Sequence, residues 1–196
     1  IKTFLTDKTG TLTFGKPRIK EVITFGKIGE IEFLERLGMA EINSNHPMSV
    51  AIMSFLKEKN IHVLAPDDFD ESPGYGMKVI KKNNKFFAGK IDYQEKNGIK
   101  IDVSERQKMQ EKKDEGASIT ALGSDGELFG FVVAEDHIRP FAKFLIDSTK
   151  KLGVKKWIML TGDNENVANR VAGGLGIDSY VANMKPEGKL SEIEKL

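Results

Sequence analysis

The sequence contains no cysteine, which excludes disulfide bonds and cysteine-ligated metal sites. The sequence also has no excess of charge, with 30 Lys and Arg residues against 29 Asp and Glu residues. The resulting net charge of +1 argues against a nucleic-acid partner. No apolar run approaches the roughly 18 to 20 residues of a membrane-spanning helix, and no signal-peptide pattern opens the chain. What remains is a globular composition, 39% hydrophobic and 30% charged, over 196 residues that suffice for one large domain or two small ones.

The two ends of the chain carry the pattern of a parallel α/β domain. From Asp136 onward, predicted helices and strands alternate, which is typical of parallel βαβ units. The predicted elements are strands at residues 1–6, 154–160 and 179–182, and helices at residues 141–152, 164–175 and from 186 onward. Because the chain opens on a strand without Met and stops inside a predicted helix, we expect it to be a piece of a longer protein.

The middle of the chain predicts an antiparallel sheet with helices. Apolar residues at helical spacing from Ile31 to Ala40 predict a first helix. Pro47 suits the first turn of a second helix, with Ser44 or Asn45 as its cap. The other predicted elements are a linker at residues 14–17, strands at 18–25, 77–80, 86–89, 117–122 and 128–134, a loop at 67–73 and a helix at 104–115.

These patterns predict an α/β fold with two domains. Residues 1–17 and 133–196 are expected to form one discontinuous domain around a parallel sheet. Residues 18–132 are expected to form an inserted α+β domain around an antiparallel sheet.

The first predicted strand ends at a carboxylate, in the stretch Asp7-Lys8-Thr9-Gly10-Thr11-Leu12-Thr13. Open α/β sheets bind ligands at the carboxyl ends of their strands, and an aspartate there can act as a nucleophile toward phosphorus. Thr161-Gly162-Asp163 follows another predicted strand and Lys189 lies near a helix start, so a hydroxyl and a cation are expected beside a phosphoryl group on Asp7. A simple turn after an edge strand remains the alternative. Residues 10–17 nearly match a P-loop but end in Pro17, which lacks the hydroxyl that the pattern needs.

Four motifs resemble those of P-type ATPases. Residues 7–11 are identical to the phosphorylation motif of that family, and Thr161-Gly162-Asp163-Asn164 matches its Thr-Gly-Asp motif. Asp136-His137-Ile138-Arg139-Pro140 resembles its Asp-x-x-Arg-Pro segment, and Pro186-Glu187-Gly188-Lys189 resembles the region of its phosphate-site lysine, with Gly188 in place of Asp. The resemblance covers essentially the whole chain and implies a haloacid-dehalogenase-like phosphorylation domain with an inserted nucleotide-binding domain. The catalytic residues it implies are Asp7, Lys8, Thr9, Thr161, Gly162, Asp163 and Lys189.

Motifs in the middle of the chain resemble the heavy-metal-transporting branch of that family. Ser44-Asn45-His46-Pro47-Met48 resembles its Ser-Glu-His-Pro-Leu motif, and Gly74-Tyr75-Gly76 matches its paired pocket glycines. Gly89 matches part of a Gly-Asn pair, whose Asn is Lys90 here. Taken without the resemblance, His46 is better explained as a satisfied histidine in an interhelical turn. The resemblance, closest to a CopB-like copper transporter, implies nucleotide binding by Glu41, His46, Pro47, Gly74, Gly76, Gly89 and Lys90.

The same resemblance implies cofactors, partners and a location. The cofactors are ATP and Mg²⁺, with the carboxylate of Asp7 and the backbone carbonyl of Thr9 as metal ligands. A third ligand is expected in a motif after Leu196, so turnover by this chain is expected to be weak. The expected partners are transmembrane and actuator domains of the same parent chain and a copper or other heavy-metal ion bound outside these residues. The region would then be a cytoplasmic loop of an integral protein of the cell membrane.

Two other functions remain open. A soluble phosphatase of the haloacid-dehalogenase type would share the nucleophile Asp7, but such enzymes usually carry a second Asp two residues later as general acid and base. Thr9 stands at that position and cannot protonate a leaving group or activate water, which favours a longer-lived aspartyl phosphate. A non-catalytic nucleotide-binding module is the third possibility, because a Mg²⁺ ligand of the family is not among these residues.

Overall fold

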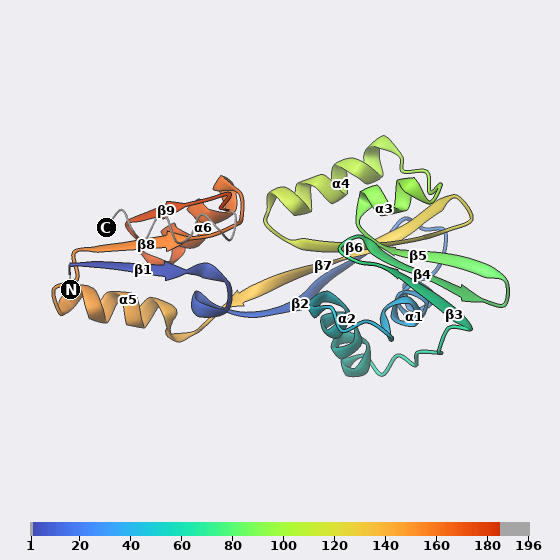
Figure 1. Ribbon diagram of the computed structural model, residues 1–196, viewed down its shortest axis with the longest axis horizontal. Helices are drawn as coiled ribbons and strands as arrows, with labels where there is room; N and C mark the ends of the chain where they lie inside the picture. The colour runs from blue at the N-terminus through green and yellow to red at the C-terminus, as the bar shows by residue number, and fades with distance from the viewer. Residues whose placement is uncertain (1, 185–196) are drawn as a thin grey trace. The chain divides into compact units, whose positions relative to one another are not determined.

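The computed structural model describes residues 2–184, which divide into two compact units (Figure 1). Within the described residues, the first unit comprises 2–16, 114–116 and 136–184, and the second comprises 17–113 and 117–135. In the described part of the chain, no helix is long and apolar enough to cross a membrane.

A parallel sheet forms the centre of the first unit. Its strands are β1 (Thr3–Asp7), β8 (Lys156–Leu160) and β9 (Ser179–Val181), in the spatial order β1-β8-β9. Both pairings are parallel, with Asp7 in register with Leu160. Helices α5 (Phe141–Lys151) and α6 (Glu165–Leu175) alternate with the strands along the chain. The predicted parallel α/β architecture is confirmed.

Apolar side chains from both helices pack with β8 to form the core of this unit. Ile146 of α5 and Ala168 of α6 are fully buried in the same cluster as Trp157 and Met159 of β8. Phe4 of β1 stacks on the Trp157 ring, with 4.6 Å between centroids. This packing fixes β1 beside β8, and with it the edge of the sheet at which Asp7 lies.

The second unit is built on a sheet with the order β2-β7-β6-β5-β4-β3. From β7 to β3, every neighbouring pair is antiparallel. The strands are β2 (Thr13–Thr24), β3 (Asp68–Ser72), β4 (Gly76–Lys81), β5 (Asn84–Gly89), β6 (Ser118–Ser124) and β7 (Glu127–Ile138). The predicted antiparallel sheet and its hairpin at β4 and β5 are confirmed.

Helices cover both faces of this antiparallel sheet, as Figure 1 shows. The helices α1 (Glu30–Glu41) and α2 (Pro47–Glu58) share one apolar cluster with Phe86 and Leu122 of the sheet. The helices α3 (Ile91–Lys96) and α4 (Val103–Asp114) share another cluster with Phe87 and Ala121. Adjacent residues thus point to opposite faces, as the twofold period of a strand requires.

Two segments predicted as irregular are strands, and one helix was not predicted. Residues 14–17, predicted as a linker, span the boundary between the two units, but they are strand residues of β2 and not irregular. Pro17 is tolerated there because β2 is an edge strand that need not donate every amide. The loop prediction for residues 67–73 is wrong, because the acidic residues of β3 form the opposite edge, where charge protects an open strand. Helix α3 was not predicted, because it is too short to show an apolar periodicity.

We expect Leu37→Ala to lower the free energy of unfolding by about 2 to 5 kcal/mol, because this α1 side chain is fully buried and its removal leaves a cavity. Leu64→Ala is the matched control, since Leu64 is 61% exposed and should change that free energy by no more than about 0.5 kcal/mol. Urea unfolding of the two variants measures the difference. Equal destabilisation by both substitutions would contradict the packing described for α1.

Candidate active site

Asp7 and Thr161 lie at the same edge of the parallel sheet. Asp7 is the last residue of β1 and is in register with Leu160, the last residue of β8. Thr161 follows directly, and its backbone amide donates to the Val181 carbonyl at 3.0 Å. The two motifs lie at the ligand-binding edge of a parallel sheet, as sequence analysis expected.

The Thr-Gly-Asp segment is ordered by its own hydrogen bonds. The Thr161 hydroxyl is almost fully buried and accepts a hydrogen bond from the Asp163 amide at 3.1 Å. Because that oxygen is the acceptor, its proton remains to be donated to another group. The Asp163 carboxylate forms an ion pair with the Lys8 ammonium, whose side chain is only 12% exposed. Lys8 and Asp163, 155 positions apart in the sequence, thus meet beside Asp7.

The loop after Asp7 turns sharply at Thr9 and Gly10. Residues Lys8–Leu12 form a single wide helical turn, within which Thr9 has an extended ψ of 125° and Gly10 a φ of +77°. A side chain at Gly15 would bring its Cβ within 3.1 Å of the Gly10 Cα, so the two glycines allow close approach of the backbone. The chain continues into strand β2, not into a helix, so the rejection of a P-loop is confirmed.

Asp136 and Arg139 hold this loop, a role that sequence analysis did not assign to them. The Asp136 carboxylate accepts from the Thr13 hydroxyl at 2.6 Å and from the Gly15 amide at 3.1 Å. The Arg139 guanidinium donates to the carbonyls of Thr13 and Gly10, at 3.0 and 3.2 Å. The Asp-x-x-Arg-Pro motif therefore positions the backbone on either side of the turn that follows Asp7. The motif lies far from Thr13 in the sequence, so no local pattern indicates this role.

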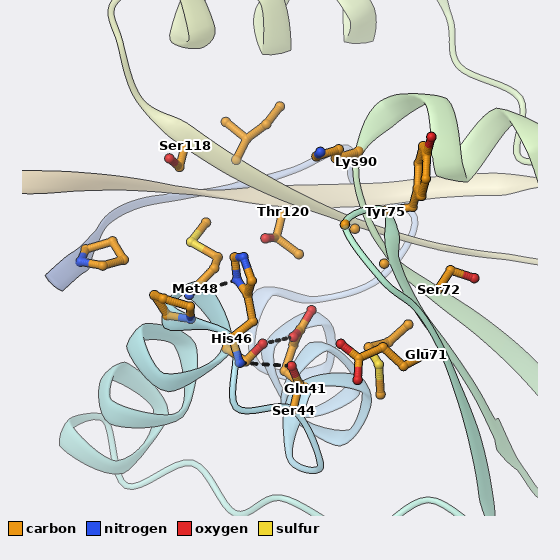
Figure 2. Close-up of a pocket in the computed structure, with 18 of the residues that line it drawn as sticks. Glu41, Ser44, His46, Met48, Glu71, Ser72, Tyr75, Lys90, Ser118 and Thr120 are labelled. Atoms are coloured by element: carbon orange, nitrogen blue, oxygen red, sulfur yellow. Dashed lines mark hydrogen bonds between the residues drawn. The ribbon is translucent and has the colours of Figure 1, made fainter. Parts of the chain in front are cut away.

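A separate pocket of about 470 Å³ lies within the second unit (Figure 2). That volume suits a small-molecule ligand or cofactor. The residues predicted to bind nucleotide all line it, namely Glu41, His46, Pro47, Gly74, Gly76, Gly89 and Lys90. The pocket also contains Glu71, Lys113, Ser118 and Thr120, which sequence reasoning missed because no motif surrounds them.

His46 caps helix α2 and lines the pocket at the same time. Its Nδ1 accepts a hydrogen bond from the Met48 amide at 3.2 Å, so the prediction of Ser44 or Asn45 as the cap is wrong. Ser44 instead accepts from the His46 amide at 3.2 Å. Since Nδ1 is an acceptor, the proton of the neutral ring lies on Nε2 and remains available to a ligand. The capping bond also fixes the ring where it borders the pocket (Figure 2).

Glu41 lies at the base of the pocket, at the end of α1. It is 6% exposed and accepts a hydrogen bond from the Ser49 hydroxyl. Burial raises the pKa of the Glu41 carboxyl, the Ser49 hydrogen bond opposes that effect, and the charge of Glu71 adds to it. A buried carboxyl whose charge is poorly stabilised is suited to pair with hydrogen-bond donors of a ligand.

The pocket glycines allow two strands to approach each other. Gly76 and Gly89 are cross-strand partners, and a Cβ on Gly76 would lie 2.2 Å from the Ala88 carbonyl oxygen. A Cβ on Gly89 would lie 2.4 Å from the Tyr75 carbonyl oxygen. Gly74 differs, because a side chain there would meet no atom within 4 Å, and its φ of +78° explains the glycine. Strand packing thus explains Gly76 better than access for a ligand ring does.

Lys189 lies outside the described residues, so its predicted place beside Asp7 stays a prediction. Within residues 2–184, no group of three or more acidic or imidazole side chains is arranged to hold a metal ion. The Asp7 carboxylate and the Thr9 carbonyl carry oxygen atoms of the kind that Mg²⁺ accepts, and that ion binds few protein groups because it keeps several waters.

Comparison with known proteins agrees with this arrangement. The whole chain, residues 1–196, matches the haloacid dehalogenase-like hydrolases. The chain belongs to this family of hydrolases. Among its members, the chain is 33% identical over 196 residues to a copper-exporting P-type ATPase of Staphylococcus haemolyticus. It is also 33% identical over 196 residues to a zinc-transporting ATPase of Synechocystis. All of this chain aligns in both cases, but it spans only 24% and 26% of the lengths of those two relatives.

Solved structures show the same relationship. A zinc-transporting PIB-type ATPase in the E2.Pi state aligns with 100% of this chain and 31% of its own, with a TM-score of 0.80 and 25% identity. A catalytic CPx-ATPase domain, CopB-B, aligns over 100% of this chain and 66% of its own, with a TM-score of 0.72 and 28% identity. This hydrolase is therefore homologous to the catalytic phosphorylation and nucleotide-binding region of heavy-metal P-type ATPases, as its motifs predicted. The matches support that assignment over a soluble phosphatase.

Asp136→Ala should speed hydrogen exchange of the Gly15 amide and lower the free energy of unfolding by about 1 to 3 kcal/mol, because it leaves that amide and the Thr13 hydroxyl without their acceptor. Exchange followed by NMR and urea unfolding measure the two effects. The neighbouring Glu135→Ala is the control: its solvent-accessible ion pair with Lys20 is worth at most about 1 kcal/mol. Unchanged exchange at Gly15 in Asp136→Ala would refute the anchoring role.

Glu41→Gln should become more stable relative to the original protein as the pH rises from about 4 to about 7. Burial raises the pKa of Glu41 in the folded state, so the folded protein holds this proton more tightly than the unfolded chain does. The favourable contribution of the protonated group is complete below the unfolded pKa and is lost as the pH rises through the folded pKa. Glutamine does not ionise and keeps its contribution at every pH.

Urea unfolding at both pH values measures this difference. Glu35→Gln, at an exposed position of the same helix, is the control for removing one negative charge. A stability difference between Glu41→Gln and the original protein that does not vary with pH would contradict the raised pKa.

Proposed function

We propose that this hydrolase is the catalytic region of a heavy-metal-transporting P-type ATPase, in which Asp7 takes the γ-phosphoryl group of ATP. The observation that carries the proposal is that Asp7 ends β1 at the ligand-binding edge of the sheet with Thr9, not a carboxylic acid, two residues later. A phosphatase needs a general acid and base to hydrolyse its aspartyl phosphate. Threonine does neither, so the intermediate persists long enough to drive another process.

In the phosphoryl-transfer step, a carboxylate oxygen of Asp7 attacks the γ-phosphorus in line with the leaving group. A bond forms between that oxygen and phosphorus, and the bond from phosphorus to the β,γ-bridging oxygen breaks. ADP leaves with the bonding electron pair, and Asp7 becomes an acyl phosphate. No proton has to move in this step, because the carboxylate attacks and ADP leaves as anions. Catalysis then depends on position and charge.

The side chains around Asp7 supply that position and charge. Thr161 retains a hydroxyl proton to donate to a phosphoryl oxygen. The ion pair with Asp163 fixes the ammonium of Lys8, the residue that follows Asp7. Lys189 is proposed as a second cation on the strength of its motif alone. Asp136 and Arg139 maintain the loop that carries Thr9.

The Asp7 carboxylate and the Thr9 carbonyl would hold Mg²⁺ together with oxygens of the nucleotide. When bound, the ion neutralises negative charge on the transferring phosphoryl group. The turn at Thr9 and Gly10 orders the backbone at one of these two ligands.

We propose that ATP binds in the pocket of the second unit. A purine stacks on or accepts a hydrogen bond from the His46 ring, whose Nε2 proton is not used by the helix cap. The buried Glu41 carboxylate accepts from an exocyclic amine of the base, and burial makes that contact selective. The second unit, within residues 18–132, then acts as the nucleotide-binding domain, and residues 1–17 with 133–196 act as the phosphorylation domain.

The parent protein is proposed to be longer and to sit in a membrane. The two relatives named above are described as copper-exporting and zinc-transporting, which makes copper or another heavy-metal ion the proposed cargo. That ion, the transmembrane helices and the actuator domain would lie outside these residues, and this region would form a cytoplasmic loop. The ATP site and the nucleophile would then connect hydrolysis with transport.

Asp7→Asn should bind ATP as the original protein does but acquire no acid-stable label from [γ-³²P]ATP and Mg²⁺. The amide is isosteric with the carboxylate but is not a nucleophile toward phosphorus. Calorimetry measures ATP binding, and acid precipitation followed by counting measures the phosphoprotein. Hydroxylamine should release the label from the original protein, as expected of an acyl phosphate.

Asp147→Asn is the matched control, because Asp147 is a surface residue on α5 with 51% of its side chain exposed. It should be labelled like the original protein. Label retained by Asp7→Asn would eliminate Asp7 as the nucleophile and, with it, the proposed reaction.

A further inference from the structure

The lining of the nucleotide pocket includes two acidic side chains. They are Glu41 and Glu71; burial raises the pKa of the Glu41 carboxyl, and the charge of Glu71 adds a smaller increase. A nucleotide brings phosphate groups that are themselves anions, and burying them beside carboxylates is unfavourable without a cation. Among the described lining residues, the lysines are Lys90 and Lys113.

Lys90 is held at the rim of the pocket by its backbone. It follows Gly89, the residue paired with Gly76, and it caps the N-terminus of α3. Its amide donates to the Tyr75 carbonyl at 2.9 Å. Because Gly89 packs against the backbone of the neighbouring strand, the Cα of Lys90 has little freedom to move. The start of this side chain is therefore fixed relative to the pocket.

The ammonium of Lys90 has no carboxylate partner in the part of the chain that the structure describes. Its recorded contact is with the Tyr75 ring, 5.8 Å from the centroid. Figure 2 shows Lys90 between Tyr75 on one side and Ser118 and Thr120 on the other. Those two hydroxyl residues line the same pocket. An ammonium group without a carboxylate partner among the described residues thus shares a pocket with hydroxyl groups, which is a suitable environment for a phosphate.

Lys96 increases the positive charge at this rim without entering the pocket. Its ammonium lies 4.7 Å from the centroid of the same Tyr75 ring, but Lys96 is not among the lining residues. Two ammonium groups beside one aromatic ring repel each other. An anion placed near Lys90 relieves that repulsion, so a ligand with phosphate groups is favoured over one without them.

We propose that Lys90 binds a phosphate group of the nucleotide in this pocket and so selects nucleoside polyphosphates over nucleosides. The inference rests on the proposed ATP binding and adds a residue that chooses between ligands. The motif that Lys90 belongs to ordinarily carries asparagine, which offers a neutral amide at this position. Lysine offers a full charge and rotatable donors on a flexible stem, so the contact is directed at an anion.

Calorimetric titration of the whole chain with adenosine, ADP and ATP, in EDTA to exclude metal effects, tests this inference. Lys90→Gln should weaken binding of ADP and ATP by about tenfold, the size expected for loss of a charge-assisted hydrogen bond, and leave adenosine within about twofold. Lys90→Arg keeps the charge and should restore ATP binding to within about threefold of the original protein. Lys96→Gln removes the same charge outside the pocket and should alter ATP binding by less than about twofold.

Three results would overturn the inference and leave ATP binding in place: equal weakening of adenosine and ATP by Lys90→Gln, no effect on either ligand, or a loss specific to phosphate in Lys113→Gln instead. The first assigns Lys90 a role in pocket shape, and the last assigns the phosphate contact to another residue. Failure of the original protein to bind ATP at all is a different outcome, since it would overturn the proposed nucleotide site together with this inference.

Discussion

The arrangement at the phosphorylation site depends on the hydrogen bonds that the Asp136 carboxylate accepts. This carboxylate binds the Thr13 hydroxyl across 123 positions of sequence and also binds the Gly15 amide. This contact joins the start of β2 to the end of β7, where the chain enters and leaves the second unit. Arg139 adds donors to carbonyls of the same loop. The turn that follows Asp7 is therefore set by a residue that never needs to touch a substrate.

The nucleotide pocket is built from groups that also stabilise the fold. His46 caps the N-terminus of α2 with one ring nitrogen and leaves the other to the pocket. Gly76 and Gly89 permit two strands to approach and thereby place Lys90 at the rim. Glu41 is the exception, because burial of its charge costs stability and the Ser49 hydroxyl offsets only part of that cost. Shared roles of this kind tie the geometry of the pocket closely to folding.

Much of the fold follows from local pattern, because the elements with clear periodicity were predicted. Apolar spacing from Ile31 to Ala40 matches α1, and the alternation after Asp136 matches the parallel unit. Errors occurred where tertiary contacts override local signals. Pro17 suggested an irregular segment but lies in an edge strand, and Ser44 or Asn45 was the predicted cap of α2 although His46 provides it.

The candidate site divides in the same way. Asp7, Thr161 and His46 lie in short motifs whose order along the chain is informative. The contacts of Asp136 and Lys8 join residues more than a hundred positions apart, and no local pattern encodes such pairs. Ser118 and Thr120 resemble ordinary strand residues until the sheet places them opposite α2 (Figure 2). Their place in the pocket depends on the topology of the sheet, which a single sequence predicts less well than it predicts helices and strands.

The position of β2 beside β7 has an architectural consequence. The long segment between these strands starts and ends side by side, since the two strands are neighbours in one sheet. Inserting a segment with adjacent ends adds little loop-closure entropy to the host, whatever the length of the segment. The second unit is thus a module that evolution can enlarge, shorten or replace without moving β1 or β8. Divergence in ligand preference can accumulate there while the chemistry at Asp7 stays unchanged.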